Sequence, residues 1–447
     1  MKKLFGTDGI RGVANEELSP ELAYKVGRAA AYELKDSKNK IIVIGRDTRI
    51  SGDLLRSALT AGILSVGVDV IDVGIVPTPA IAYFTREYEA AAGIVISASH
   101  NPGEFNGIKF FSSKGFKFPD KVEIEIEELI ENIDNIKYHP TGSEVGVIRN
   151  DENAADKYAD YLKSKVDIDL SGMKIVIDCG HGATLTCADK VFKDLGAEAI
   201  ILNDDYNGMD INDDCGSTKP ELVQEAVIKY KADIGLSFDG DGDRLIAIDE
   251  KGKIMDGDHY LAACATHLMH KGKLPDNMIV STVMCNLGLR EYADKNGMKV
   301  IMTPVGDRYV LEEMIAKGYS LGGEQSGHFI YLEDSTTGDG ILSALKLLET
   351  MIDEKKSLSE LNELMITYPQ VLKNAKVSNE SKFKYQDDEV INKAIREFED
   401  KFTEQGRVLI RPSGTEPLVR VMVEGKELEV LERESEKLVK IIEDRLG

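Results

Sequence analysis

The sequence has few cysteines, no long apolar run and fewer basic than acidic residues, and each of these shortages excludes a class of protein. The five cysteines among 447 residues form no CxxC pair, so we expect neither a disulfide framework nor a zinc site. No apolar run is long enough to span a bilayer or to act as a secretory signal, which predicts a cytoplasmic protein without membrane contact. The formal net charge of -23 argues against a general nucleic-acid binder, which needs a basic face. The lack of a GxSxG elbow weakens a serine-hydrolase interpretation.

What the chain does contain is a pattern of strand, helix, glycine and second strand that occurs three times. A chain of 447 residues is too long for one hydrophobic core and long enough for three or four domains. Parallel strands require a crossover of this kind, so each copy predicts a βαβ unit. The predicted first strands are residues 39–45, 173–178 and 278–283, and the second strands are residues 68–73, 197–202 and 298–302.

The C-terminal part of the chain has a different order of elements. A helix near residues 388–402 precedes two strands, at residues 407–410 and 418–424, and a final amphipathic helix follows. This order indicates an α+β module. The predicted fold class is therefore α/β: three related α/β domains with mixed, largely parallel sheets, and a C-terminal α+β domain. The predicted domains are residues 1–152, 153–253, 254–367 and 368–447.

The most informative segment is FDGDGDR, residues 238–244. Here Asp239, Asp241 and Asp243 alternate with glycines, and Arg244 follows. Three carboxylates so close together repel one another unless a cation lies among them, and hard oxygen ligands favour Mg²⁺ over Ca²⁺ or Mn²⁺. An EF-hand is excluded because Arg244 stands at the position where that loop needs glycine, and because the flanks are predicted strands. The simpler alternative is an acidic surface turn without a metal.

A second segment, GIVISASHNP at residues 93–102, is a strand that runs into a polar turn. Ligands of open α/β sheets bind at such strand ends, where small residues leave the hydroxyl of Ser97 or Ser99 exposed. A nucleophilic serine needs a base, and His100 follows Ser99 directly, although adjacency in sequence does not place two side chains together. A turn without chemistry is the alternative.

Two further loops are rich in donors for an oxyanion. FGTDGIRG, residues 5–12, combines glycines with the hydroxyl of Thr7 and the guanidinium of Arg11. RPSGTEP, residues 411–417, lies between two predicted strands, and its donors would form a cup for a phosphate. These donors are Arg411, Ser413, the amides around Gly414, Thr415 and, on the next strand, Arg420. The alternatives are a plain N-terminal loop and a hairpin turn.

A polar loop, GGEQSGH at residues 322–328, follows another predicted strand. Glu324 and Ser326 offer a carboxylate and a hydroxyl that could bind sugar hydroxyls. His328 could polarise a substrate group or exchange a proton. A glycine-rich connection without a ligand is the alternative.

Together, FGTDGIRG, SASHNP, DGDGDR, GEQSGH and RPSGTEP resemble the α-D-phosphohexomutase family, in the same order and over essentially the whole chain. The resemblance implies that Ser99 carries a phosphoryl group. It also implies a Mg²⁺ site made of Asp239, Asp241, Asp243 and a phosphate oxygen on Ser99. The implied catalytic residues are Ser99, Lys109, His328, Arg11 and Arg244. The expected substrate contacts are Thr7, His100, Glu324, Ser326, Arg411, Ser413, Gly414, Thr415 and Arg420.

The implied activity is that of a phosphohexose mutase. Phosphorylated Ser99 would donate to O1 of a sugar 6-phosphate, and the resulting 1,6-bisphosphate would turn over and return its 6-phosphate to Ser99. The expected cofactors are Mg²⁺ and the sugar 1,6-bisphosphate, and the expected partner is a phosphosugar. FGTDGIRG and GEQSGH favour the family branch that acts on glucosamine phosphates, with the glucose and mannose phosphate branch as the alternative. Outside the mutases, the rivals are a non-catalytic Ca²⁺-binding protein and a metal-dependent phosphatase.

Two expectations concern the protein as a whole. A homodimer is expected from the family resemblance. The C-terminal domain has to hold either phosphate of the intermediate and then open for release, which predicts a hinge near Tyr368 and Pro369.

Overall fold

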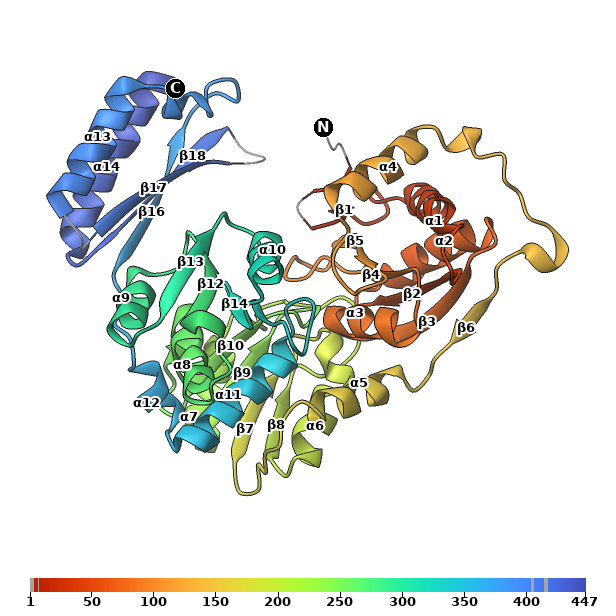
Figure 1. Cartoon of the computed structure of the whole chain (residues 1–447), viewed down its shortest axis with the longest axis horizontal. Helices are drawn as coiled ribbons and strands as arrows, with labels where there is room; N and C mark the ends of the chain where they lie inside the picture. Colours follow the sequence, from red (N-terminus) through yellow and green to blue (C-terminus); the bar gives the residue numbers. More distant parts are fainter. Residues whose placement is uncertain (1–3, 7, 403–405, 414–416) are drawn as a thin grey trace. The chain divides into compact units, whose positions relative to one another are not determined.

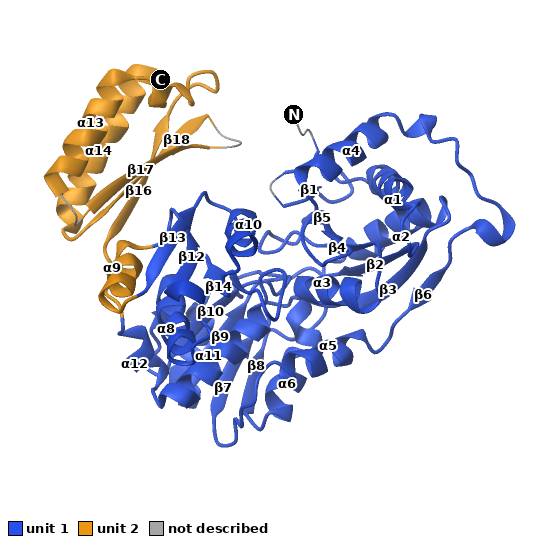
Figure 2. Ribbon diagram, in the orientation of Figure 1, with its two compact units in different colours: residues 1–285, 298–364 blue, residues 286–297, 365–447 orange. Residues whose placement is uncertain are grey.

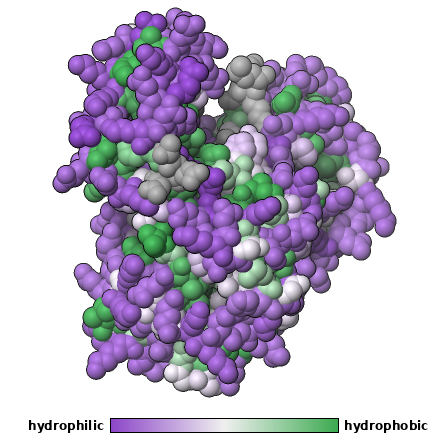
Figure 3. Space-filling view, turned by 60° about the vertical axis from the view of Figure 1, so that its left-hand side comes forward, coloured by the Kyte–Doolittle hydropathy of each residue, from purple (hydrophilic) through white to green (hydrophobic). Residues whose placement is uncertain are grey.

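The structure is a computed structural model that describes residues 4–6, 8–402, 406–413 and 417–447. Its chain forms two compact units (Figure 2). Unit 1 comprises residues 1–285 and 298–364, and unit 2 comprises residues 286–297 and 365–447. Among the residues that the structure describes, no helix combines the length and apolar character that a bilayer span needs. The face drawn in Figure 3 is largely hydrophilic, with scattered hydrophobic residues.

The first part of unit 1 is built on a six-stranded mixed sheet in the order β1-β5-β4-β2-β3-β6 (Figure 1). β4, β2, β3 and β6 run parallel, whereas β1, β5 and β4 pair antiparallel. The strands are β1 (Ile10–Val13), β2 (Ile41–Arg46), β3 (Asp69–Ile75), β4 (Ala92–Ile96), β5 (Phe105–Ser112) and β6 (Ile148–Asn150).

Helices cover both faces of this sheet, which explains why the sequences of its central strands are apolar without interruption. Ile42 and Ile44 belong to the hydrophobic cluster formed with α1, α2 and α4. The helix α3 packs closely against Gly93, where a Cβ would lie 2.1 Å from Thr85 Oγ1. The helices are α1 (Pro20–Leu34), α2 (Gly52–Leu64), α3 (Thr78–Glu87) and α4 (Asp120–Glu131). The N-cap of α1 is Ser19, whose side chain accepts from Leu22 N.

The second sheet of unit 1 has the order β11-β10-β9-β7-β8. β9, β7 and β8 run parallel, and β10 turns back antiparallel beside β9. The turn between β9 and β10 therefore projects from the carboxyl end of a parallel strand, where α/β sheets present their ligand-binding loops. The elements are α5 (Ala154–Lys163), β7 (Lys174–Asp178), α6 (Ala188–Asp194), β8 (Glu198–Leu202), α7 (Glu221–Tyr230), β9 (Ile234–Phe238), β10 (Leu245–Asp249) and β11 (Ile254–Met255).

The third sheet of unit 1 has the order β13-β12-β14-β15, with β13, β12 and β14 parallel. β14 and β15 form an antiparallel pair, and the loop between them carries GEQSGH. The elements are α8 (Gly257–His270), β12 (Met278–Thr282), β13 (Lys299–Thr303), α10 (Asp307–Lys317), β14 (Leu321–Gly323), β15 (Phe329–Tyr331), α11 (Gly340–Glu354) and α12 (Leu358–Asn362).

Unit 2 is an antiparallel sheet in the order β16-β18-β17 with two packed helices. Its apolar core joins the sheet to α13 and α14. It also includes α9, because Leu287 N donates to Glu424 Oε1 at 2.8 Å and Asn286 Nδ2 donates to Tyr368 O at 2.9 Å. The elements are α9 (Leu287–Lys295), β16 (Gln370–Lys376), α13 (Glu389–Phe402), β17 (Gly406–Pro412), β18 (Leu418–Gly425) and α14 (Leu428–Leu446).

The predicted fold class is confirmed. The three predicted strand pairs are parallel pairs in the structure, namely β2 with β3, β7 with β8, and β12 with β13. The C-terminal module has the predicted helix, two strands and final helix, and it adds β16 at the edge of the sheet.

Candidate active site

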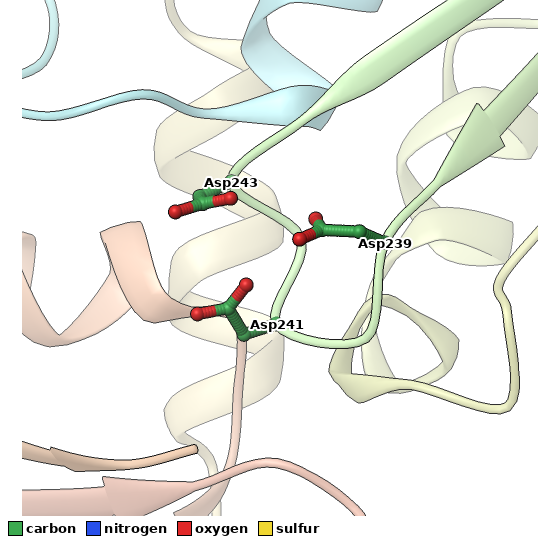
Figure 4. A group of neighbouring side chains, drawn as sticks. All are labelled: Asp239, Asp241 and Asp243. Atoms are coloured by element: carbon green, nitrogen blue, oxygen red, sulfur yellow. The ribbon is translucent and has the colours of Figure 1, made fainter. Parts of the chain in front are cut away.

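The loop between β9 and β10 brings the three aspartates of FDGDGDR together. Asp239, Asp241 and Asp243 are all buried, and a carboxylate oxygen of each lies within 4.8 Å of the others. Figure 4 shows the three carboxylates turned toward a common space. Gly242 has a φ of 70°, a left-handed conformation that glycine adopts readily and that lets the loop fold back on itself. The alternating Asp-Gly pattern thus produces one cluster of acids.

The oxygens of this cluster suit a hard divalent cation. Among the described residues, Oδ1 of Asp241 and Oδ1 of Asp243 are buried without a hydrogen-bond donor. Burial and the charges of Asp243 and Asp241 raise the pKa of Asp239 well above its usual value. A cation bound by all three carboxylates would offset this repulsion, and Mg²⁺ takes such oxygen ligands. The residues present therefore fit a magnesium site.

Ser99 lies in the turn after β4 and reaches this cluster. Its Oγ donates to Asp239 Oδ2 at 2.7 Å and lies 3.3 Å from Nδ1 of His100. Ser99 has a φ of 54°, which is rare for a residue with a side chain. Burial, together with the charges of Arg244 and Arg11, lowers the pKa of His100 to about 4. The contact between Ser99 and His100, which adjacency in sequence could not establish, is present in the structure.

Two predicted cations lie beside the cluster. Lys109 on β5 is buried, and its Nζ is 2.8 Å from Asp241 Oδ2 and 3.1 Å from Asp8 Oδ2. Burial alone would lower the pKa of Lys109, but the charges of Asp241 and Asp8 raise it above its usual value. Arg11 on β1 donates to Asp8 Oδ2 at 2.5 Å and to Asn101 Oδ1 at 3.4 Å. Both positive charges are therefore held next to the Ser99 turn.

Arg244 supplies a third cation at the end of the aspartate loop. Its backbone N donates to Asp239 Oδ1 at 3.1 Å, and its Nε lies 3.9 Å from Asp243 Oδ1. Burial alone would lower the pKa of Arg244, but the charges of Asp243 and Asp239 raise it. The guanidinium is thus kept charged beside the cluster.

The three predicted residues of the loop between β14 and β15 differ from one another in burial and in contacts. Glu324 is half-buried and its Oε1 accepts from Gly306 N at 3.2 Å, while Ser326 is exposed. His328 is buried, with Nδ1 3.6 Å from Asp243 Oδ2 and Nε2 3.4 Å from Asp307 Oδ2. Burial acts to lower the pKa of His328, and the charges of Asp243 and Asp307 outweigh it and raise the pKa. His328 therefore contacts the carboxylates behind the loop, and Ser326 faces solvent.

Three site residues were missed from the sequence: Asp8, Lys117 and Asp307. Lys117 Nζ donates to Asp8 Oδ1 and to Asp307 Oδ2, both at 2.6 Å. Asp8 also binds Lys109 and Arg11. Lys117 thus joins the N-terminal motif to the start of α10. Asp8 lies inside FGTDGIRG, so the motif itself was the available signal, whereas Lys117 in a loop and Asp307 at the start of α10 belong to no distinctive sequence pattern.

In unit 2, the two predicted arginines face each other across a strand pair. Arg411 on β17 and Arg420 on β18 are direct register partners. Burial and the charge of Arg420 lower the pKa of Arg411. Ser413 N donates to Leu418 O at 2.9 Å, and Ser413 O accepts from Lys382 Nζ at 2.8 Å. Like charges placed opposite each other destabilise a sheet, and an anion bound between the two guanidiniums would offset this repulsion. The predicted contacts Thr7, Gly414 and Thr415 lie outside the described residues.

Comparison with known proteins identifies the family. Four models of phosphoglucomutase/phosphomannomutase match: α/β/α domain I at residues 2–137, domain II at 156–252, domain III at 256–368 and the C-terminal domain at 372–441. The phosphoglucosamine mutase of Finegoldia magna is 57% identical over 445 residues, which cover 100% of this chain and 99% of that protein. The chain belongs to the phosphoglucomutase/phosphomannomutase family. It is therefore an isomerase of the phosphomutase type, and the family predicted from the five motifs is confirmed.

Solved structures of the family share the fold. A phosphoglucomutase/phosphomannomutase family protein from Burkholderia thailandensis aligns with a TM-score of 0.82 at 27% identity, covering 100% of this chain and 99% of that one. The N-acetylphosphoglucosamine mutase of Aspergillus fumigatus, solved in complex with GlcNAc-6P and magnesium, aligns with a TM-score of 0.70 at 17% identity. That alignment covers 100% of this chain and 96% of that one.

Proposed function

We propose that this phosphomutase interconverts glucosamine 6-phosphate and glucosamine 1-phosphate through phosphorylated Ser99 and a 1,6-bisphosphate. The observation that carries the proposal is the 2.7 Å hydrogen bond from Ser99 Oγ to Asp239, which places a hydroxyl nucleophile on the edge of a buried carboxylate cluster. The choice of glucosamine is supported by the Finegoldia magna relative, a phosphoglucosamine mutase with 57% identity. On the same support, the product would feed the synthesis of UDP-N-acetylglucosamine and of the cell wall.

The reaction consists of two phosphoryl transfers that balance each other. In the first, the bond between Ser99 Oγ and phosphorus breaks while O1 of the sugar bonds to phosphorus; O1 loses its proton and Ser99 Oγ takes one up. In the second, the bond between O6 and phosphorus breaks while Ser99 Oγ bonds to phosphorus; Ser99 Oγ loses its proton and O6 takes one up. Among the described residues, His100 has the ring nitrogen nearest to Ser99 Oγ, at 3.3 Å, so we assign the proton hand-over to His100. Lys109 and His328 instead contact carboxylates.

Catalysis of phosphoryl transfer depends mainly on positioning of the reactants and on neutralisation of charge. Mg²⁺ bound by Asp239, Asp241 and Asp243 would neutralise charge on the transferring group, and magnesium is also present in the Aspergillus fumigatus relative. Lys109, Arg11 and Arg244 lie around the cluster as cations. Because Lys109 is buried, its charge acts with little screening by water.

The two remaining loops would bind the rest of the sugar phosphate. Glu324 and Ser326 are proposed to bind sugar hydroxyls, with Ser326 exposed and Glu324 half-buried. Arg411 and Arg420, opposite each other in unit 2, are proposed to bind the phosphate that is not reacting. Thr7, Ser413, Gly414 and Thr415 complete the proposed phosphate contacts. These donors recognise a phosphate whichever carbon bears it, as the reorientation of the bisphosphate requires.

Phosphorus NMR of the full chain tests the substrate and the reaction together. The protein is incubated with Mg²⁺, a trace of sugar 1,6-bisphosphate and one of glucosamine, glucose or mannose 6-phosphate. We expect glucosamine 1-phosphate to form fastest, Ser99→Ala to form none, and Ser112→Ala, at the far end of β5, to match the wild type. Faster conversion of glucose or mannose phosphate would reassign the substrate within the family. Release of inorganic phosphate alone would overturn the mutase assignment in favour of a phosphatase.

A further inference from the structure

Arg49 stands in the loop between β2 and α2, and its guanidinium is fully buried against the turn that carries Ser99. All five of its N–H donors are used. Nε donates to Asp47 Oδ2 at 2.9 Å, Nη2 to Ser99 O at 2.9 Å and Asn101 O at 2.7 Å, and Nη1 to Phe105 O at 3.0 Å and to Pro102 O. Four of the five acceptors are backbone carbonyls of a single segment, residues 99–105.

Asp47 holds the same turn from its other side. Its Oδ2 accepts from Ser97 Oγ at 2.5 Å, and Ser97 Oγ in turn accepts from Ser99 N at 2.9 Å. Asp47 Oδ1 accepts from Arg49 N at 2.9 Å. The Asp47–Arg49 pair is therefore connected to both the N–H and the C=O of Ser99. This arrangement fixes the peptide groups on either side of the residue that we propose to be phosphorylated.

The support is needed because of the backbone conformation of Ser99. Its φ of 54° is left-handed, and an ordinary residue keeps such a conformation only where its surroundings impose it. The conformation matters for chemistry because it directs Oγ to Asp239 Oδ2, 2.7 Å away. A small displacement of a reacting atom lowers a transfer rate by about 100-fold.

We propose that Arg49 is a positioning residue for phosphoryl transfer: its guanidinium holds the Ser99 turn so that the phosphoserine is aligned with the sugar oxygen and not with water. The proposal rests on the proposed function, in which Ser99 carries the phosphoryl group. Lysine cannot replace Arg49, because a single ammonium has three donors and lacks the planar fork that binds four carbonyls at once. Asn212 is a weaker second support, since its Nδ2 also donates to Ser99 O at 2.9 Å.

Arg28 provides a matched control. It is also a buried arginine, and its Nη2 donates to the carbonyls of Ile136 at 3.2 Å and Tyr138 at 3.1 Å. These acceptors lie outside residues 97–105. Arg28→Lys thus makes the same chemical change in a comparable setting without touching the Ser99 turn.

The test compares Arg49→Lys, Arg28→Lys and the wild type as full chains with Mg²⁺. Each protein is phosphorylated with sugar 1,6-bisphosphate, its phosphoserine content is measured by mass spectrometry, and the phosphoryl group is followed to sugar or to water after glucosamine 6-phosphate is added. The partition between sugar and water, and kcat per phosphorylated chain, do not depend on how much of the sample is folded. A loss of stability alone would leave both unchanged.

For Arg49→Lys we expect kcat per phosphorylated chain to fall about 100-fold, KM to change by less than about twofold, and the share lost to water to rise. In Arg28→Lys, the phosphoryl group should divide between sugar and water as it does in the wild type. If Arg49→Lys loses the same share of phosphoryl groups to water as the wild type and has the same kcat per phosphorylated chain, the proposal is overturned. If Arg49→Lys does not fold, Asn212→Ala decides: a raised share lost to water supports the positioning of the turn, and an unchanged share contradicts it. A wild type that never forms phosphoserine would instead contradict the proposed function.

Discussion

Ser99 and Asp239, which are 140 residues apart in the sequence, share a 2.7 Å hydrogen bond between Oγ and Oδ2. The bond joins the turn after β4 of the first sheet to the turn after β9 of the second. Both turns follow strands that run parallel to a neighbour, so both lie where α/β sheets bind their ligands. The contact unites the two most informative motifs of the sequence in one site.

Binding of Mg²⁺ should stabilise the protein as well as activate it. The three buried carboxylates repel one another, so a cation at 100 times its dissociation constant should add about 2.7 kcal/mol of stability. Thermal unfolding with Mg²⁺ and with a chelator measures this, and chelation should also stop turnover. Asp241→Asn should lose most of the shift, whereas Asp213→Asn, an exposed residue of the same domain, should keep it. Equal shifts in the two variants would contradict the magnesium site.

Lys117 should matter for both stability and activity. It is largely buried between Asp8 and Asp307, so Lys117→Met removes the cation that the two carboxylates share. Because Asp8 keeps Lys109 and Arg11 and Asp307 keeps His328, the cost should be about 1.5–3 kcal/mol. The activity should fall because Asp8 also holds Lys109 and Arg11. Lys121→Met is the control, because that side chain is 85% exposed and should change stability by less than about 0.5 kcal/mol. Equal melting temperatures for the two variants would refute the bridging role.

Arg411→Gln should weaken catalysis without weakening the fold. Charge-assisted hydrogen bonds are worth about 1.5–3 kcal/mol, so losing one to the phosphate should lower kcat/KM for glucosamine 6-phosphate about 10- to 100-fold. Removing a positive charge opposite Arg420 should leave stability unchanged or raise it slightly. Lys440→Gln, an exposed change on α14, is the control for steady-state kinetics and thermal unfolding. Unchanged kcat/KM in Arg411→Gln would remove Arg411 from the phosphate site.

Glu434 gives the C-terminal unit a pH-dependent contribution. Partial burial acts to raise the pKa of Glu434, but Lys401, Lys437 and Arg433 outweigh it and lower that pKa to about 2. Because the folded pKa is depressed, the stabilisation is present at neutral pH and is lost as pH falls from the unfolded value of 4.5 toward 2. Glu434→Gln should therefore cost about 0.5–1 kcal/mol at pH 7, as expected for a surface network. In denaturant titrations the difference from wild type should shrink below pH 4.5; a constant difference would contradict this assignment.

The fold could be predicted where the pattern of apolar residues indicates which segments are buried. Runs such as residues 41–44 are apolar throughout because helices cover both faces of the sheet, and glycine turns mark their ends. The membership of α9 in unit 2 could not be predicted. It depends on hydrogen bonds from Asn286 and Leu287 to Tyr368 and Glu424, which are far away in the sequence. Tyr368 is thereby fixed within unit 2, and the hinge near Tyr368 and Pro369 stays a prediction.

The candidate site could be predicted as a set of loops, but not as a set of contacts. Asp239, Asp241 and Asp243 were found because one short motif contains all three, and the roles proposed for Ser99 and Lys109 came from the family resemblance. Lys117 was missed because its two partners, Asp8 and Asp307, lie 109 and 190 residues away. The local sequence around a single carboxylate or lysine does not distinguish a buried residue with an ion-pair partner from a residue exposed to solvent.

The most direct test of the central claim follows the phosphoryl group on Ser99 through one turnover. The protein is phosphorylated with labelled sugar 1,6-bisphosphate, freed of ligand, and mixed with Mg²⁺ and a stoichiometric amount of glucosamine 6-phosphate. Peptide mass spectrometry locates the label before and after mixing. The account predicts label on Ser99 before mixing and its transfer to the sugar afterwards, at a rate no slower than kcat. Label on another residue, or label that leaves Ser99 only as inorganic phosphate, would contradict it.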